Sequence, residues 1–444
     1  MFAEPREYDE DMSEVPGEGA DFFGRIPLFR EFARLLSTGG GPVNWELARQ
    51  VAVATAAGAD TLGMTPQLPS PAAAPDPREA RAWDDRLRLA ELWVDPATSL
   101  PAPGVALSAR PVSRPDWAEA VLPGFAPLVE PGARRMSEAL GADAAPGMPG
   151  AGDMVGRVGG LLTGLQAGAL VGQLARTVLS QYELAMPPAD PGRVLVLPEN
   201  VRGFEQSSGL PSDQFRLWLA CHEVAGQRLL VGVAWLRDHL HRVVDEVAHE
   251  TDPDASGLLD RLRSLETGGG PEALQELLEG GGEELLGPPS AALQAAIARL
   301  EVVLTLTAGY PVVIAERALD GRLPALDAIQ AAVRRRLADQ QAPHGLYAQL
   351  LRADPERAAA AKGERFCREV LAATDIEGLD RVWAHPDFLP SAEELAVPGR
   401  WLERVGLVGG EEVDLEEGLR ALLEGEGEDR DGPPPDQAGG QPPR

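Results

Sequence analysis

The stretch from Ser212 to Leu240, SDQFRLWLACHEVAGQRLLVGVAWLRDHL, is the longest continuous helical pattern in the sequence. Its apolar residues recur at the spacing of an amphipathic helix. Leu210-Pro211-Ser212 leads into it, with Ser212 in the place of a capping residue and Asp213 in the first turn, near the positive end of the helix dipole. The sequence therefore predicts one long helix over residues 212–240, around which the rest of the chain packs.

His222 and Glu223 lie inside this apolar pattern. A His-Glu pair on a helix is half of the zinc-peptidase signature His-Glu-x-x-His, in which the second histidine, four residues after the first, places two imidazoles on one face. Here the second position is Gly226, which has no ligand atom. Two interpretations remain open, because a lone His-Glu pair also arises by chance: a remnant of a metal site, or a structural pair.

Other histidines offer weaker candidates for metal ligands. His241, Asp245 and His249 recur every four residues on the charged end of the pattern. That spacing could hold a metal, but it is more typical of a solvated helix terminus. His385 belongs to a Trp-Ala-His-Pro-Asp turn, where we expect a structural hydrogen bond rather than metal binding.

The two cysteines, Cys221 and Cys367, are far apart and form no Cys-x-x-Cys motif. A reducing compartment is then the default, and we expect a cytoplasmic protein. Cys221 neighbours His222, but adjacent helical residues point about 100° apart and cannot clamp one ion. We expect Cys221 to be buried and inert.

The chain of 444 residues carries a net charge of -29, and its pI is near 4.6. Length of this order allows a large core. Clustered cations are needed to neutralise phosphates, so this charge argues against nucleic-acid partners and against anionic lipid surfaces. The acidic N-terminus has no apolar core and does not resemble a signal peptide. We place no transmembrane helix.

Further helical patterns predict a mainly α-helical fold. Asn44 and Asp76-Pro77 each mark a helix start, as does Ser290. Arg193 to Pro198 is the clearest strand candidate, and residues 96–116 predict an extended crossing. The remaining helices are expected at 22–36, 45–58, 77–94, 117–136 as short pieces broken by Pro123 and Pro131, 291–319 with a kink or end at Pro311, 323–340, two over 346–375, 401–408 and 414–423.

Two local patterns admit more than one interpretation. Gly156, Gly160, Gly164, Gly168 and Gly172 recur every four residues. A phosphate loop and a membrane dimer face are the minor alternatives, and a buried helix with a glycine groove for a close neighbour is favoured. The Arg-Arg-Arg run at 334–336 is more typical of a salt-bridged helix face than of an anion site.

Composition suggests how the chain is divided. Residues 1–20 are acidic and glycine-rich and are expected to be disordered, as is the Pro/Gly/acidic tail at 425–444. One large domain is expected over 21–424. Within it, the acidic and glycine-rich residues 266–290 predict a flexible insertion.

Five segments carry a family resemblance: GGGPVNWELARQ at 39–50, LAELWVD at 89–95, VLPENV at 196–201, LWLACHEVAGQRLL at 217–230 and RVWAHPDFLPSAEEL at 381–395. Together they resemble the zincin-like metallopeptidase type 2 family, a set of bacterial hydrolases, over about residues 20–408. The resemblance implies a zincin-like helical domain with little β structure. It also implies that His222 corresponds to the first zinc ligand and Glu223 to the general base that activates a zinc-bound water.

The resemblance also shows where this chain departs from the family pattern. The second ligand position is Gly226. A later acidic segment, Glu-Gly-x-x-Asp, corresponds to Ala-Gly-Tyr-Pro-Val at 308–312, so its acidic positions are Ala308 and Val312. A catalytic zinc needs three protein ligands and a water, and the motif positions supply one. Glu316 lies just beyond this segment and is a candidate replacement by proximity alone.

Two functions follow as hypotheses. One is a zinc-dependent hydrolase whose metal site is degenerate and impaired or inactive, with zinc as the cofactor where activity remains. The other is a non-catalytic scaffold that keeps the peptidase fold without metal and binds a peptide or partner protein.

Overall fold

The computed structural model describes residues 41–58, 76–143, 151–184, 186–188, 190–252, 290–339 and 359–408. The helices predicted at 22–36 and 414–423 and the first of the two predicted over 346–375 lie outside these residues. So do the predicted insertion at 266–290 and the predicted disordered ends at 1–20 and 425–444.

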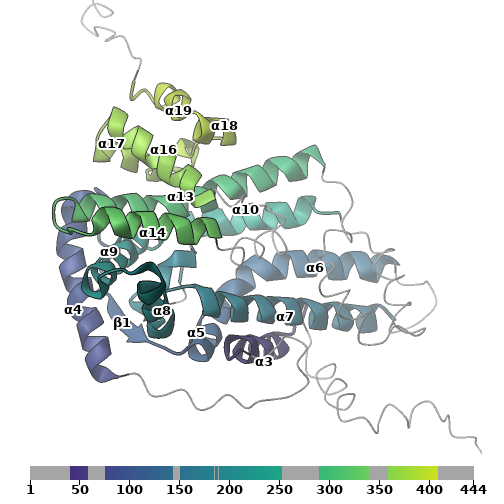
Figure 1. Ribbon diagram of the computed structural model, residues 1–444. Helices are drawn as coiled ribbons and strands as arrows, with labels where there is room; N and C mark the ends of the chain where they lie inside the picture. Colours follow the sequence, from purple (N-terminus) through teal and green to yellow (C-terminus); the bar gives the residue numbers. More distant parts are fainter. Residues whose placement is uncertain are drawn as a thin grey trace, which may run out of the picture.

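The described chain is mainly α-helical, as predicted, with two short strands (Figure 1). Its N-terminal elements are α3 (Trp45–Ala56), α4 (Pro77–Val94), η1 (Asp95–Ala97), β1 (Ser108–Pro111), α5 (Arg114–Val121), η2 (Leu122–Phe125), α6 (Ala126–Asp143) and α7 (Ala151–Thr177). The central elements are η3 (Tyr182–Leu184), β2 (Arg193–Val196), α8 (Pro198–Ser208), α9 (Ser212–Leu230), α10 (Leu236–Glu250), α13 (Ala291–Leu319) and α14 (Leu326–Asp339). The C-terminal elements, grouped at the top of Figure 1, are α16 (Ala359–Ala373), α17 (Ile376–Asp380), η5 (Arg381–Trp383), η6 (Pro386–Phe388), α18 (Ala392–Ala396) and α19 (Pro398–Arg404).

The central helix is shorter than predicted. Helix α9 ends at Leu230, the chain turns, and α10 begins at Leu236, so the prediction of one helix over 212–240 is wrong. The turn is pressed against the rest of the chain: a Cβ on Gly232 would lie 2.3 Å from the Arg228 carbonyl oxygen and 2.9 Å from that of Pro101. Every residue of α9 from Trp218 to Leu230 is buried, which makes α9 the core helix.

The start of α9 also differs from the prediction. Pro211, not Ser212, is the N-cap, and no side chain caps the helix. The Ser212 hydroxyl instead donates to Glu205 Oε2 at 2.9 Å, which ties α9 to α8. The other predicted starts are confirmed, because the side chains of Asn44, Asp76 and Ser290 each accept a backbone N–H of the helix that follows.

Prolines interrupt the helices less than predicted. Helix α13 runs through Pro311 without ending, and α6 runs through Pro131, whereas Pro123 does lie in the short break η2. Helix α13 is long and apolar enough to cross a membrane by length and composition, and 72% of its most apolar window is buried inside the protein. Packing against α9, α10 and α16 accounts for that apolar surface, since a buried core helix has the same composition.

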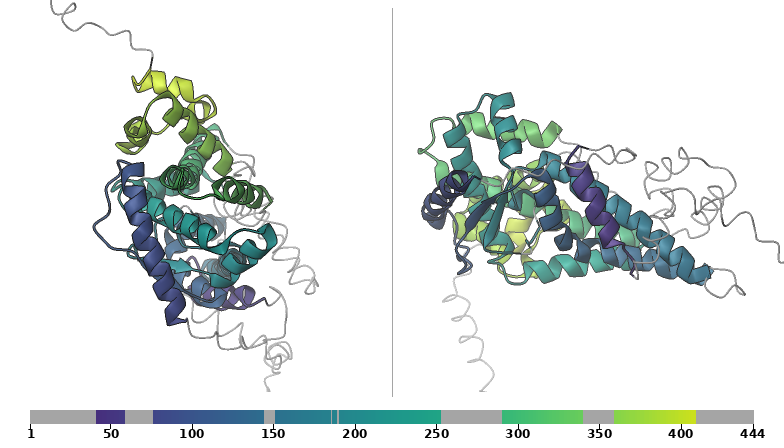
Figure 2. Two further views of the ribbon diagram at one scale, coloured as in Figure 1. Left: turned by 60° about the vertical axis from the view of Figure 1, so that its left-hand side comes forward. Right: turned by 90° about the horizontal axis from the view of Figure 1, so that it is seen from below.

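The glycine row forms a helix contact, which confirms the favoured interpretation of a groove for a close neighbour. Helix α3 lies along α7 (Figure 2, right). A Cβ on Gly164 would lie 2.5 Å from the Asn44 carbonyl oxygen, and one on Gly168 would lie 2.4 Å from that of Ala48. The backbones are close enough for Asn44 N–H to donate to the Gly160 carbonyl oxygen at 2.9 Å.

Strands β1 and β2 pair in parallel, with Ser108 opposite Arg193, and β2 confirms the predicted strand at 193–198. The even-numbered residues of β1 bond toward β2, because Ser108 N–H donates to Gly192 and Val112 N–H to Val196. The main-chain polar groups of Ala109 and Pro111 therefore point away from β2, toward the outer edge of β1. Asp84 Oδ1 accepts the Ala109 N–H at 2.7 Å, and Pro111 has no N–H, so the outer edge of β1 offers no free donor at either position.

We expect Gly168→Ala to lower the free energy of unfolding by about 1–3 kcal/mol, because the added methyl group would meet the backbone of α3. Gly203→Ala is the matched control: Gly203 is also helical, but a Cβ there meets nothing within 4 Å. This control should raise stability by about 0.5–1 kcal/mol. Urea unfolding followed by circular dichroism measures both, and equal effects would contradict the close contact between α3 and α7.

Candidate functional site

His222 is buried in the middle of α9, with 7% of its surface exposed. Its ring stacks on that of Trp218, one helical turn earlier, with centroids 5.5 Å apart. Its Nδ1 lies 3.2 Å from Glu223 Oε1. The first candidate ligand therefore contacts an aromatic ring and the adjacent carboxylate.

The Glu223 carboxylate is 1% exposed and joins α9 to the crossing that leads from α7 into η3. Oε1 accepts a hydrogen bond from the Ser180 hydroxyl at 2.8 Å, and Oε2 accepts the Tyr182 N–H at 3.0 Å. Sequence reasoning missed both partners. They lie 43 and 41 residues before Glu223, in a segment without a recognisable motif.

Tyr182 packs against Gly226, the position of the second ligand in the intact signature. A Cβ on Gly226 would lie 2.6 Å from Tyr182 Cβ and 3.0 Å from Cγ. These atoms cannot swing away as the end of a flexible side chain could, because Tyr182 is 1% exposed and its N–H is held by Glu223. Burial, and then the charge of Glu223, raise the pKa of the Tyr182 hydroxyl. Tyr182 thus fills the space next to the vacant ligand position as a neutral, fixed ring.

The segment at 308–312 has structural contacts in place of acidic ligands. Gly309 lies against α16, where its Cβ would be 2.4 Å from the Glu364 nitrogen. The Tyr310 hydroxyl donates to Asp380 Oδ1 at 2.6 Å, while the Thr98 hydroxyl donates to Oδ2 at 2.8 Å. Burial, and then the charge of Asp380, raise the pKa of Tyr310. This network joins α13, the segment after η1 and α17, and sequence reasoning did not identify Asp380.

The Glu316 carboxylate is bound by two arginines. Its Oε2 accepts from Arg368 Nη2 at 2.7 Å, and its Oε1 lies 3.5 Å from Arg334 Nη2. Burial raises the pKa of Glu316 despite these cations. Arg334 also pairs with Glu364, so the predicted salt-bridged interpretation of the arginine run is confirmed there. In the described part of the chain, no group of three or more His, Cys, Asp or Glu side chains is arranged to hold a metal ion.

The remaining candidates lie on the surface. Asp245 and His249 are exposed on α10 and His241 is partly exposed, so their row is a solvated helix face. His385 Nδ1 accepts the Asp387 N–H at 3.2 Å and caps η6, which confirms the predicted structural hydrogen bond.

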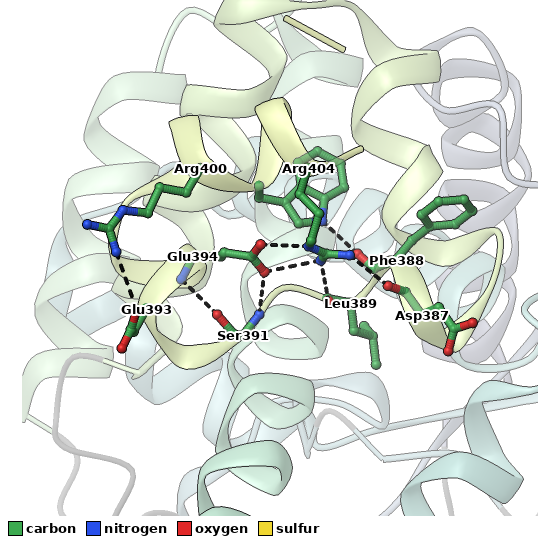
Figure 3. Close-up of polar contacts among 9 residues, drawn as sticks. Asp387, Phe388, Leu389, Ser391, Glu393, Glu394, Arg400 and Arg404 are labelled. Carbon is green, nitrogen blue, oxygen red and sulfur yellow. Dashed lines mark hydrogen bonds and ion pairs between the residues drawn. The ribbon is translucent and has the colours of Figure 1, made fainter. Parts of the chain in front are cut away.

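The C-terminal segment that carried part of the resemblance is held by Arg404 (Figure 3). The Arg404 guanidinium donates to the Glu394 carboxylate at 2.6 Å and to the carbonyl oxygens of Asp387 and Leu389 at 2.9 Å each. Ser391 and Glu394 form a reciprocal capping box at the start of α18. This segment packs against α16, and the hydrogen bond and ring contact that His222 makes within the described part of the chain go to Glu223 and Trp218 instead.

We expect Gly226→Ala to lower the free energy of unfolding by about 1–3 kcal/mol, since its methyl group would overlap Tyr182. Gly132→Ala is the control, because a Cβ at that helical glycine meets nothing within 4 Å. Denaturant unfolding of the two variants provides the comparison. A stable, fully folded Gly226→Ala protein would show that Tyr182 is free to move.

Cys221 is buried, as predicted, and burial raises the pKa of its thiol to about 12. An unfolded thiol titrates near pH ~8.5. Because the folded pKa is the higher one, the contribution of the thiol to stability is complete below pH ~8.5 and is lost as the pH rises toward 12. We therefore expect the free energy of unfolding to fall between about pH 9 and 11, and to fall less steeply in Cys221→Ala. Labelling of the native thiol by iodoacetamide at pH ~8 would contradict its burial.

The chain is similar to known proteins in both sequence and fold. Residues 43–402 match the family described as zincin-like metallopeptidases. The fold is similar to the crystal structure of a "putative hydrolase with a novel fold" from Chloroflexus aurantiacus, with a TM-score of 0.56 and 21% identity, over 83% of this chain and 100% of that one. No curated protein matches the sequence. Because the match covers most of its length, the chain belongs to the zincin-like metallopeptidase family.

Proposed function

We propose that the chain is a non-hydrolytic member of its family, which holds no catalytic zinc on α9 and keeps the scaffold to bind a peptide or a partner protein. The donor set does not fit a tetrahedral catalytic site, which takes three protein ligands and a water. His222 is the one motif position with a ligand atom, and both oxygens of its neighbour Glu223 already accept protein hydrogen bonds.

The observation that carries this proposal is the position of Tyr182. A missing ligand can be replaced from elsewhere when the space beside the metal stays open. Here the Cβ and ring of Tyr182 take that space next to Gly226. A histidine at position 226 would therefore collide with Tyr182 before it could form a pair of zinc ligands with His222.

A zinc-dependent hydrolase is the competing function, and family membership favours it. It requires ligands for zinc besides His222. Ala308 and Val312 supply none, and Glu316 is paired with Arg368. These contacts make the non-hydrolytic function the better supported one.

The proposal includes a cytoplasmic location and partners other than nucleic acid or membranes. The net charge of -29 disfavours nucleic-acid and membrane partners, and the two free, buried cysteines support a reducing compartment. The proposed partner is a peptide or a protein, because that is the class of ligand that a peptidase-like scaffold would recognise.

We expect the full chain, incubated with excess zinc and desalted, to hold far less than stoichiometric zinc by mass spectrometry. His222→Ala should hold the same amount, and so should the control His385→Ala, in which an exposed histidine is removed. A mixture of fluorogenic peptides should not be cleaved above the buffer rate. Stoichiometric zinc that is lost in His222→Ala and retained in His385→Ala, together with peptide cleavage, would overturn the proposal.

A further inference from the structure

A groove of about 540 Å³ lies where α4 and η1 meet the C-terminal end of α13, the start of α14, and α16. Figure 1 shows α4, α13 and α14 converging at this side of the molecule. The volume falls within the range of about 300–1,000 Å³ that small ligands occupy. No residue of α9 lines the groove, so His222 and Glu223 are not part of its walls.

The groove has an apolar part with one aromatic anchor. Trp93 lies at the end of α4, and the Arg322 guanidinium sits 5.5 Å from its ring centroid. The Arg322 Nη1 also donates to the Ala318 carbonyl oxygen at 2.9 Å, so the stacked guanidinium is held in place while its remaining donors stay available. The other apolar lining residues are Pro96, Ala97, Val313, Leu326 and Leu371.

The charges in the groove are held apart from each other. Within the described parts of the chain, neither Arg317 nor Arg322 has a carboxylate within 4.0 Å, and neither Asp320 nor Asp327 has a cation within that distance. Arg368 differs, because Glu316 and Glu364 both bind it, at 2.7 and 2.8 Å. Two cations and two carboxylates without an oppositely charged partner among the described residues thus surround one hollow.

Helix ends explain the positions of three of these four charges, and Asp320 is the exception. Arg317 lies in the last turn of α13 and Asp327 in the first turn of α14, where each complements the helix dipole. Asp320 is the C-cap of α13, at the negative end of that dipole, where a carboxylate is disfavoured. Arg322 lies in the connecting turn and donates to the Ala318 carbonyl oxygen in the last turn of α13. All four charges line the same hollow.

We propose that this groove binds a small zwitterion with an apolar body, of amino-acid to dipeptide size. Its carboxylate would pair with Arg317 and Arg322, its ammonium group with Asp320 and Asp327, and its side chain would pack beside Trp93. Arginine suits the first role because its planar donors match a carboxylate. The inference rests on the binding role proposed above and does not depend on the metal site. Zinc content therefore tests the proposed function, and ligand titration tests this groove.

The experiment is calorimetric titration of the full chain with the dipeptide Leu-Phe and with two blocked forms. N-acetyl-Leu-Phe lacks the ammonium group, and Leu-Phe-amide lacks the carboxylate. We expect Leu-Phe to bind, and each blocked form to bind about tenfold or more weakly, because each has lost its charged partner. L-phenylalanine, titrated alongside, shows whether the amino acid or the dipeptide fits better, and either one supports the proposal when both charges are needed.

Two variants assign the charges to residues. Arg322→Met should weaken Leu-Phe about tenfold and reduce the difference between Leu-Phe and its amide, because Arg317 alone then binds the carboxylate. Asp327→Asn should likewise reduce the difference between Leu-Phe and its acetylated form, because Asp320 alone then binds the ammonium group. Arg335→Met is the matched control, since Arg335 is an exposed arginine on α14 that does not line the groove.

Three results would overturn the proposal. They are no binding of Leu-Phe or L-phenylalanine at millimolar concentration, equal binding of the free and blocked forms, and a loss of affinity in Arg335→Met as large as that in Arg322→Met. Circular dichroism of each variant verifies folding, and the two charge variants replace exposed side chains, which the core does not need.

Discussion

The buried carboxylate of Glu223 is the contact on which the arrangement around α9 depends. It receives the Ser180 hydroxyl and the Tyr182 N–H, and so holds the chain between α7 and β2 against the central helix. A buried charge is stable in a protein only when its lone pairs are satisfied. Two consequences follow: Tyr182 is fixed over Gly226, and Ser180 is placed to bridge to Val196 beside the sheet.

Other buried carboxylates connect distant segments in the same way. Asp380 accepts from Thr98 and Ser99, in the segment after η1, and from Tyr310 on α13. Arg336, on α14, reaches Glu183 and the Thr177 carbonyl oxygen at the end of α7. In a chain with so many acidic residues, a few of the described ones thus serve as cross-links of the core.

The sequence predicted those features that depend on local patterns. Helix starts at Asn44, Asp76 and Ser290 follow from capping chemistry, and the glycine row on α7 follows from its spacing. The end of α9 at Leu230 is not visible in the local pattern, and the turn that follows it lies against Pro101, more than a hundred residues away. The site was predictable to the same extent. His222 and Glu223 are visible as a motif, whereas Ser180 and Tyr182 reach them only through the fold.

The short sheet bears on how such a protein can recognise a chain in extended form. With the Ala109 N–H taken by Asp84 and no N–H at Pro111, the outer edge of β1 offers no free main-chain donor at these two positions for β-augmentation. An extended peptide lying along this edge would be recognised there through its side chains and end groups. A second copy of the chain would find the same two donors missing if it paired along this edge of β1.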